Sequence, residues 1–137
     1  MQYEWSSSLE TGYELIDTQH KQLFAAINDL IETCRLGKGI QELEKSLNFL
    51  NDYTIKHFFD EEQVQLKYNY PDYPNHKKLH ENFKITVRDL KVKMIMKGAS
   101  EELISEVQAK IGDWLVTHIK GQDLKLAAHL KSQINKA

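Results

Sequence analysis

The strongest constraint on the fold is the spacing of the mostly apolar residues that would face a protein interior. They recur at alternating steps of three and four residues along most of the chain. This spacing places side chains on one face of an α-helix, because about 3.6 residues make a turn. Glycines or prolines interrupt the pattern at "LGKGI", "YNYPDYPNH" and "MKGAS". The sequence therefore predicts four helices, at about residues 17–36, 40–67, 75–97 and 100–130.

Short breaks between long helices favour an all-α, up-down-up-down four-helix bundle with an N-terminal arm. All 137 residues are expected to form a single domain, since this length suffices for one hydrophobic core. We expect the arm at residues 1–15, the bundle at 16–131 and a tail at 132–137. Trp5, Leu9 and Tyr13 should hold the arm across the bundle, because aromatic and aliphatic side chains favour covering apolar surface.

Polar side chains interrupt the apolar stripes of all four helices. There are seven of them: His20, His57, Glu61, His76, His80, His118 and Asp123. Each unpaired buried polar side chain costs about 1 to 3 kcal/mol, whereas a whole domain is stable by only about 5 to 15 kcal/mol. A metal centre would compensate them, because imidazoles and carboxylates are good ligands for transition metals. Seven ligands exceed the usual shell of one ion, so we expect two ions that share the carboxylates.

The last stripe changes phase after His118. Its apolar positions resume at Leu126 and Leu130, in register with Asp123, which places one extra residue between His118 and Asp123. Residues five apart lie about 140° apart on a regular α-helix, whereas a π-turn brings both to one face. The spacing therefore predicts a π-bulge or local unwinding at this point, eased by Gly121.

The prediction of a metal centre depends on the joint pattern, because a single inward histidine is more often a hydrogen-bonded core residue. His129 lies beyond Asp123 in the chain and has no acidic or histidine partner at helical spacing, so we interpret it as a surface or structural residue. A ferritin-like di-iron oxidase would use Glu-x-x-His motifs, and no glutamate here precedes a histidine by three positions. A zinc or metal-storage protein is a further alternative.

The chain resembles the hemerythrin family, in particular its bacterial branch, over nearly its whole length. The resemblance lies in "IDTQHKQLF" with His20, "HFFDEE" with His57 and Glu61, "HKKLH" with His76 and His80, and "WLVTHIKGQD" with His118 and Asp123. It implies a non-haem centre of two Fe ions, bridged by both carboxylates and an oxo or hydroxo group. It also implies that the chain is one hemerythrin-like domain.

The resemblance further implies how the histidines are divided. One iron would take His76, His80 and His118, and the other only His20 and His57, which leaves that iron a position for O2. The implied function is reversible dioxygen binding by a carrier, storage protein or oxygen-sensing domain, rather than by an enzyme. A di-iron redox sensor or an oxidase or peroxidase is the alternative, and members of the family also occur fused to signalling proteins.

Five apolar residues beside the predicted ligands are candidates for an O2 pocket: Leu23, Phe24, Phe58, Leu115 and Ile119. Leu115 matches a pocket leucine of the family, and the others are placed by their proximity to the ligands. A water-poor pocket would oppose the escape of charge with bound oxygen. Ordinary core packing is the alternative explanation for each of the five.

The charge composition argues against nucleic-acid and membrane partners. The 18 basic residues are interspersed with 20 acidic ones, for a net charge of −2, and form no basic stripe. No segment approaches the roughly 18 apolar residues of a membrane helix, and the start "MQYEWSSSLETG" lacks the regions of a secretory signal. The single Cys34 excludes an internal disulfide and is expected to be a quiet core thiol, so we expect a cytoplasmic location.

Overall fold

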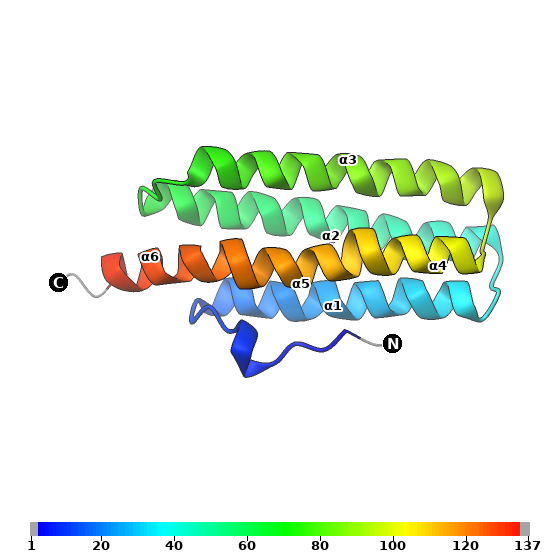
Figure 1. The fold of residues 1–137 in the computed structure, drawn as a ribbon, viewed down its shortest axis with the longest axis horizontal. Coiled ribbons are helices and arrows are strands. Elements are labelled where there is room, and N and C mark those ends of the chain that lie inside the picture. Colours follow the sequence, from blue (N-terminus) through cyan, green and yellow to red (C-terminus); the bar gives the residue numbers. More distant parts are fainter. Residues whose placement is uncertain (1–2, 135–137) are drawn as a thin grey trace.

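The computed structural model describes residues 3–134, which form a bundle of four long helical segments with an N-terminal arm (Figure 1). The first three segments are α1 (Glu14–Arg35), α2 (Ile40–Lys67) and α3 (Tyr73–Lys97). The fourth is a continuous run of α4 (Glu101–Val107), η2 (Gln108–Asp113), α5 (Trp114–His118), η3 (Ile119–Asp123) and α6 (Leu124–Ile134). The predicted all-α, up-down-up-down bundle is therefore confirmed.

Each helix packs against its neighbour in the chain, and the fourth segment returns to α1, so the bundle closes on itself. Ser100 caps the start of the fourth segment, because its hydroxyl accepts a hydrogen bond of 3.0 Å from the backbone N–H of Leu103. Gly98 ends α3 with a positive φ of 70°. No helix within residues 3–134 is long and apolar enough to cross a membrane.

The helix ends differ from the predicted ones by a few residues. α1 begins at Glu14 rather than near residue 17, and α3 begins at Tyr73 rather than near 75. Pro74 fits into the first turn of α3, where a missing backbone N–H breaks no helical hydrogen bond. α6 continues to Ile134. Residues 1–2 of the predicted arm and 135–137 of the predicted tail lie outside the described residues.

The hydrophobic core has two parts with the polar positions between them. The larger part includes Leu23, Phe58 and Ile119, and the smaller part includes Ile16 and Leu126. Along α1 the order is Ile16, His20, Leu23, and along the last segment it is Ile119, Asp123, Leu126. The polar side chains thus form a layer across the bundle, with apolar packing above and below. Cys34 is buried in the larger part.

The arm lies along α1 and carries the short 3-10 helix η1 (Ser7–Leu9) (Figure 1). Leu9 is buried in the larger core, Trp5 packs against the same core, and Tyr13 packs against the smaller one, as predicted. Tyr3, which was not predicted to hold the arm, is also buried in the larger core, with 7% exposure. The arm is therefore attached along most of its length.

Two π-helical turns interrupt the fourth segment. η3 (Ile119–Asp123) lies where the phase change predicted a π-bulge, which confirms that prediction. η2 (Gln108–Asp113) is a second π-helical turn that was not predicted. Both turns are explained by the spacing of the buried residues.

The inner face of the fourth segment is a series of buried residues spaced four apart: Leu103, Val107, Ile111, Leu115, Ile119 and Asp123. On a regular α-helix these 20 residues would make about 5.6 turns and leave the last side chain about 200° from the first. Each π-turn accommodates one extra residue. Two π-turns leave an effective length of about 18 residues, or about five full turns, which returns Asp123 to the inner face.

The first π-turn was missed because apolar residues stand at both 103 and 104 and at both 114 and 115. A stripe through Ile104 and Trp114 keeps steps of three and four and needs no inserted residue. That stripe is wrong, because Ile104 and Trp114 are only half-buried, whereas Leu103 and Leu115 are buried.

Candidate functional site

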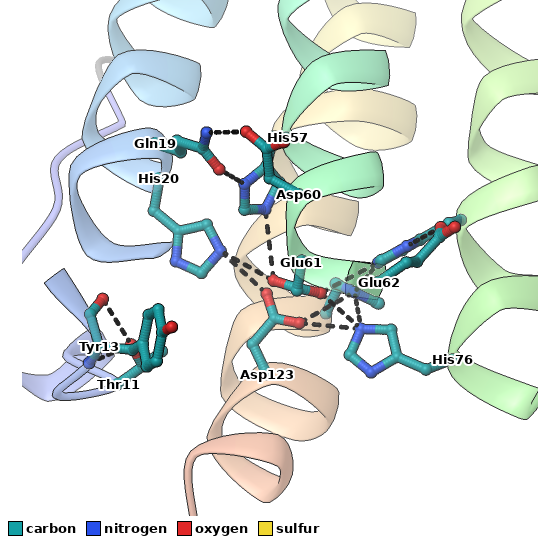
Figure 2. A network of polar contacts seen from close by, with 12 residues as sticks. Thr11, Tyr13, Gln19, His20, His57, Asp60, Glu61, Glu62, His76 and Asp123 are labelled. Atoms are coloured by element: carbon teal, nitrogen blue, oxygen red, sulfur yellow. Dashed lines mark hydrogen bonds and ion pairs between the residues drawn. The ribbon is translucent and has the colours of Figure 1, made fainter. Parts of the chain in front are cut away.

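All seven side chains that sequence analysis singled out meet in one buried layer of the bundle. Figure 2 labels His20, His57, Glu61, His76 and Asp123 among them. They come from every long helical segment: His20 from α1, His57 and Glu61 from α2, His76 and His80 from α3, His118 from α5 and Asp123 from η3. None is more than 5% exposed. The layer is therefore shielded from water on all sides.

Helical geometry sets the pairs within each segment. The pairs His57 with Glu61 and His76 with His80 are four residues apart, so each pair shares one helical face. The π-turn η3 brings His118 Nε2 to 3.2 Å from Asp123 Oδ1, although these residues are five apart. The phase change in the sequence therefore serves to place both side chains in the layer.

The seven residues divide into two groups that share both carboxylates. One group comprises Glu61, His76, His80, His118 and Asp123, and the other comprises His20, His57, Glu61 and Asp123. Within each group, one candidate ligand atom of every residue lies within 4.8 Å of the others. This arrangement allows the three-and-two division of histidines that the family resemblance implies.

Each carboxylate directs one oxygen atom to each group. Glu61 Oε1 lies 2.9 Å from His76 Nε2, and Glu61 Oε2 lies 3.4 Å from His57 Nε2. Asp123 Oδ1 lies 3.0 Å from His76 Nε2, and Asp123 Oδ2 lies 3.0 Å from His20 Nε2 (Figure 2). Two carboxylates that each divide their oxygens in this way are suited to bridging two cations.

The positions of the polar atoms in the layer suit coordination of a metal ion better than hydrogen bonding with one another. All four carboxylate oxygens are buried, and their short contacts lack hydrogen-bond geometry, so none has a hydrogen-bond partner among the described residues. His118 Nε2 lies only 3.0 Å from His76 Nε2 and 3.2 Å from His80 Nε2. Two ligand atoms about 2.1 Å from one ion and at right angles are about 3.0 Å apart. The spacing thus suits a shared ion.

The pKa values follow from burial and from the mixture of acids and histidines. Burial alone would raise the pKa of Glu61 and Asp123, but the surrounding histidines outweigh it and hold both pKa values well below their ordinary range. Burial lowers the pKa of His57. For His76, burial is outweighed by the two carboxylates, which raise its pKa to about 9. Both acids are therefore anionic at neutral pH, as ligands must be.

Outer partners orient two of the histidines. His57 Nδ1 donates to Gln19 Oε1 at 2.8 Å, and His80 Nδ1 donates to Glu62 Oε2 at 2.9 Å. In the neutral ring, a proton held on Nδ1 leaves Nε2 unprotonated and directed into the layer, which is the arrangement that metal ligands require. Gln19 in turn donates to Asp60 Oδ2 at 2.8 Å.

Neither outer partner was predicted from the sequence. Gln19 and Glu62 lie off the inward stripes, about 100° around the helix from the neighbouring candidate ligand. The only available signal was a polar residue directly beside a predicted ligand, which is common on any soluble helix. Both are nevertheless buried, at 3% and 7% exposure.

Aromatic rings restrict His118 and also His80, which an outer partner already orients. Phe58 stacks on His80 with ring centroids 3.8 Å apart and planes at 2°. Trp114 stacks on His118 at 4.5 Å and 10°. Such stacking limits rotation of the imidazole rings and so holds their nitrogen atoms toward the layer.

A small apolar cavity of about 10 Å³ adjoins the layer. Its lining comprises Leu23, Ile27, Leu50, Thr54, Phe58, Phe83, Ile111 and Leu115. The hydroxyl of Thr54 donates to the backbone oxygen of Leu50 at 2.7 Å, so the walls present no free donor. This volume is close to the least that one water molecule occupies.

The predicted pocket residues fall into two sets. Leu23, Phe58 and Leu115 line the cavity, whereas Phe24 and Ile119 are buried in the same core without lining it. His129 lies outside the layer, half-buried, and donates from Nε2 to the backbone oxygen of Tyr68 at 2.8 Å. This contact at the end of α2 agrees with a structural role for His129.

Comparison with known proteins identifies the family. The Hemerythrin HHE cation binding domain matches residues 11–130. A myohemerythrin from Theromyzon tessulatum is 35% identical over 93% of each chain, and a bacteriohemerythrin from Stenotrophomonas maltophilia is 28% identical over 96% of this chain and 83% of its own. A wild-type hemerythrin crystal structure superimposes with a TM-score of 0.83 at 30% identity, over 95% of this chain and 98% of the other. The chain therefore belongs to the hemerythrin family.

Proposed function

We propose that the seven side chains of the layer hold two iron ions and that this centre binds dioxygen reversibly. The observation that carries the proposal is the bridging arrangement of Glu61 and Asp123, in which each acid directs one oxygen to each group of histidines. Such an arrangement is more than the binding of one ion requires. Membership of the hemerythrin family supports iron as the metal.

The unequal number of histidines supports an oxygen site on one side of the centre. His76, His80 and His118 belong to one group, whereas only His20 and His57 belong to the other. A structural zinc site would instead be closed by four protein ligands. Two ferrous ions, when bound, can together donate two electrons to dioxygen and recover them on release. The group with fewer ligands is the natural place for this exchange.

The surrounding residues would keep the transfer of electrons to dioxygen reversible by excluding water. The layer is buried, and the adjoining cavity has apolar walls formed in part by Leu115 and Phe58. A water-poor environment disfavours the separation of charge that would release a reduced oxygen species. We therefore propose Leu23, Phe58 and Leu115 as the residues that protect the bound oxygen.

The lining of the cavity also supports binding rather than catalysis. Among the described residues, Thr54 is the one polar side chain in the lining, and its hydroxyl is engaged by Leu50. No free acid or base therefore faces the cavity, so proton delivery to a substrate would be slow. We propose a carrier, storage or sensing role over an oxidase.

The test is a cycle of oxygen addition and removal on protein reconstituted anaerobically with ferrous iron. We expect a visible absorption band that appears with oxygen, disappears on purging with argon and returns unchanged over several cycles. Zinc-loaded protein is the control and should show no band. Oxygen consumption with release of hydrogen peroxide, and no recovery on purging, would refute reversible binding and support an oxidase.

A further inference from the structure

The arm makes a specific contact with the first π-turn, η2, through Tyr3. The hydroxyl of Tyr3 lies 2.8 Å from Asp113 Oδ1 and 3.0 Å from the backbone oxygen of Gln108, and donates toward both. These acceptors are the last and first residues of η2. One side chain of the arm therefore bridges the whole π-turn.

Two further contacts fix the position of Tyr3. Its backbone N–H donates to Asn28 Oδ1 at 2.8 Å, and its backbone oxygen accepts from Asn28 Nδ2 at 2.8 Å, so α1 holds the arm by a paired hydrogen bond. The Tyr3 ring lies directly on Gly112, where an added Cβ would collide with the ring. Glycine is a poor helix former, so its presence in η2 fits a need for close approach.

The register of the fourth segment depends on η2. If η2 became a regular α-helix, the residues that follow would rotate by about 100° relative to those that precede it. Leu115 would then leave the cavity, and His118 and Asp123 would leave the buried layer. A π-turn is rare in isolation and requires support from its surroundings.

We propose that Tyr3 is a positioning residue, which holds η2 in its π conformation and thereby keeps Leu115, His118 and Asp123 directed into the bundle. The arm acts on the centre through the helix and touches none of its candidate ligands. The effect on metal binding rests on the proposed function, whereas the effect on η2 does not.

The first test is amide hydrogen exchange of the metal-free protein, in wild type and in the variants Tyr3→Phe and Gly112→Ala. Loss of the hydroxyl contacts should increase exchange of residues 108–118 by roughly five- to tenfold, because one or two hydrogen bonds are lost. Exchange in α2 and α3 should be unchanged. Tyr53→Phe is the matched control, since Tyr53 is a half-buried tyrosine of α2 whose ring stacks against Phe49. A uniform increase along the chain, or none, would overturn the proposal.

The second test uses the collision at Gly112. In the wild-type background, Gly112→Ala should increase the amide exchange of residues 108–118, because the new Cβ collides with the Tyr3 ring. In the Tyr3→Ala background the ring is absent, so Gly112→Ala should have little further effect on this exchange. Additive effects would show that the ring does not act on η2, and would overturn the proposal.

The third test connects the arm to the centre through cobalt(II) binding. Tyr3→Phe should change the visible spectrum of bound cobalt(II), whereas Tyr53→Phe should not. An unchanged spectrum in Tyr3→Phe would overturn the positioning role. Failure of wild-type protein to bind two cobalt ions would count against the proposed ligand set, while the exchange measurements would still decide the effect of Tyr3 on η2.

Discussion

Replacing Glu61 by alanine should remove metal from both halves of the centre. Its two oxygens lie 2.9 Å from His76 Nε2 and 3.4 Å from His57 Nε2, and the side chain is fully buried, so its loss removes an anionic ligand from each group of histidines. At a free metal concentration of about 100 times the dissociation constant, one bound ion stabilises the native state by about 2.7 kcal/mol. For a domain of this size that is an increase of about 8 °C in melting temperature per ion, or about 16 °C for the two ions of the centre. Glu61→Ala should lose most of this increase.

His129→Ala is the matched control because it removes a hydrogen bond outside the layer. Loss of the 2.8 Å contact with Tyr68 should cost about 1 kcal/mol, and so lower the melting temperature by about 3 °C with or without metal. The increase on metal addition should remain as in wild type. Calorimetry with and without metal, followed by metal analysis after desalting, separates the two variants. Equal metal content in both would refute the assignment of Glu61 as a ligand.

Three further predictions follow from the surroundings of the centre. Leu115→Ala should keep two ions but increase the autoxidation rate by admitting water, and an unchanged rate would remove Leu115 from the pocket. Gln19→Leu should lower metal affinity about 10- to 100-fold in a chelator competition, because His57 loses its acceptor; equal affinity would contradict this role. The raised pKa of His76, about 9, means that the metal-free protein holds a proton at neutral pH which metal must displace. The apparent affinity for metal should therefore fall as pH decreases below about 9. Calorimetry in two buffers at pH 7 should detect proton release on metal binding, and binding without proton release would contradict a proton held by His76.

The sequence predicted the fold and the polar layer because both depend on periodicity. Inward positions on long helices are fixed by 3.6 residues per turn, so His57 and Glu61 had to share a face with the apolar residues of α2. The phase change after His118 could be recognised because no apolar residue stands at the next position of the earlier stripe, which would be Gly121 or Gln122. Periodicity therefore sufficed wherever only one register was compatible with the apolar pattern.

The missed features depend on contacts between segments that are far apart in the sequence. Two registers were compatible with the apolar pattern around Ile104 and Trp114, and only packing against α1 and α3 selects the one with a π-turn. Gln19 serves as an outer partner because α2 brings His57 beside it, 38 residues away. Tyr3 contacts η2 across more than 100 residues, and such a contact leaves no local pattern.

The most direct test of the central claim is Mössbauer spectroscopy of protein reconstituted with the Mössbauer-active isotope of iron and equilibrated with oxygen. Two groups with three and two histidines should hold two irons in different surroundings, so we predict two irons per chain and two signals of equal area. One iron per chain, or one signal from two equivalent irons, would contradict the asymmetric centre.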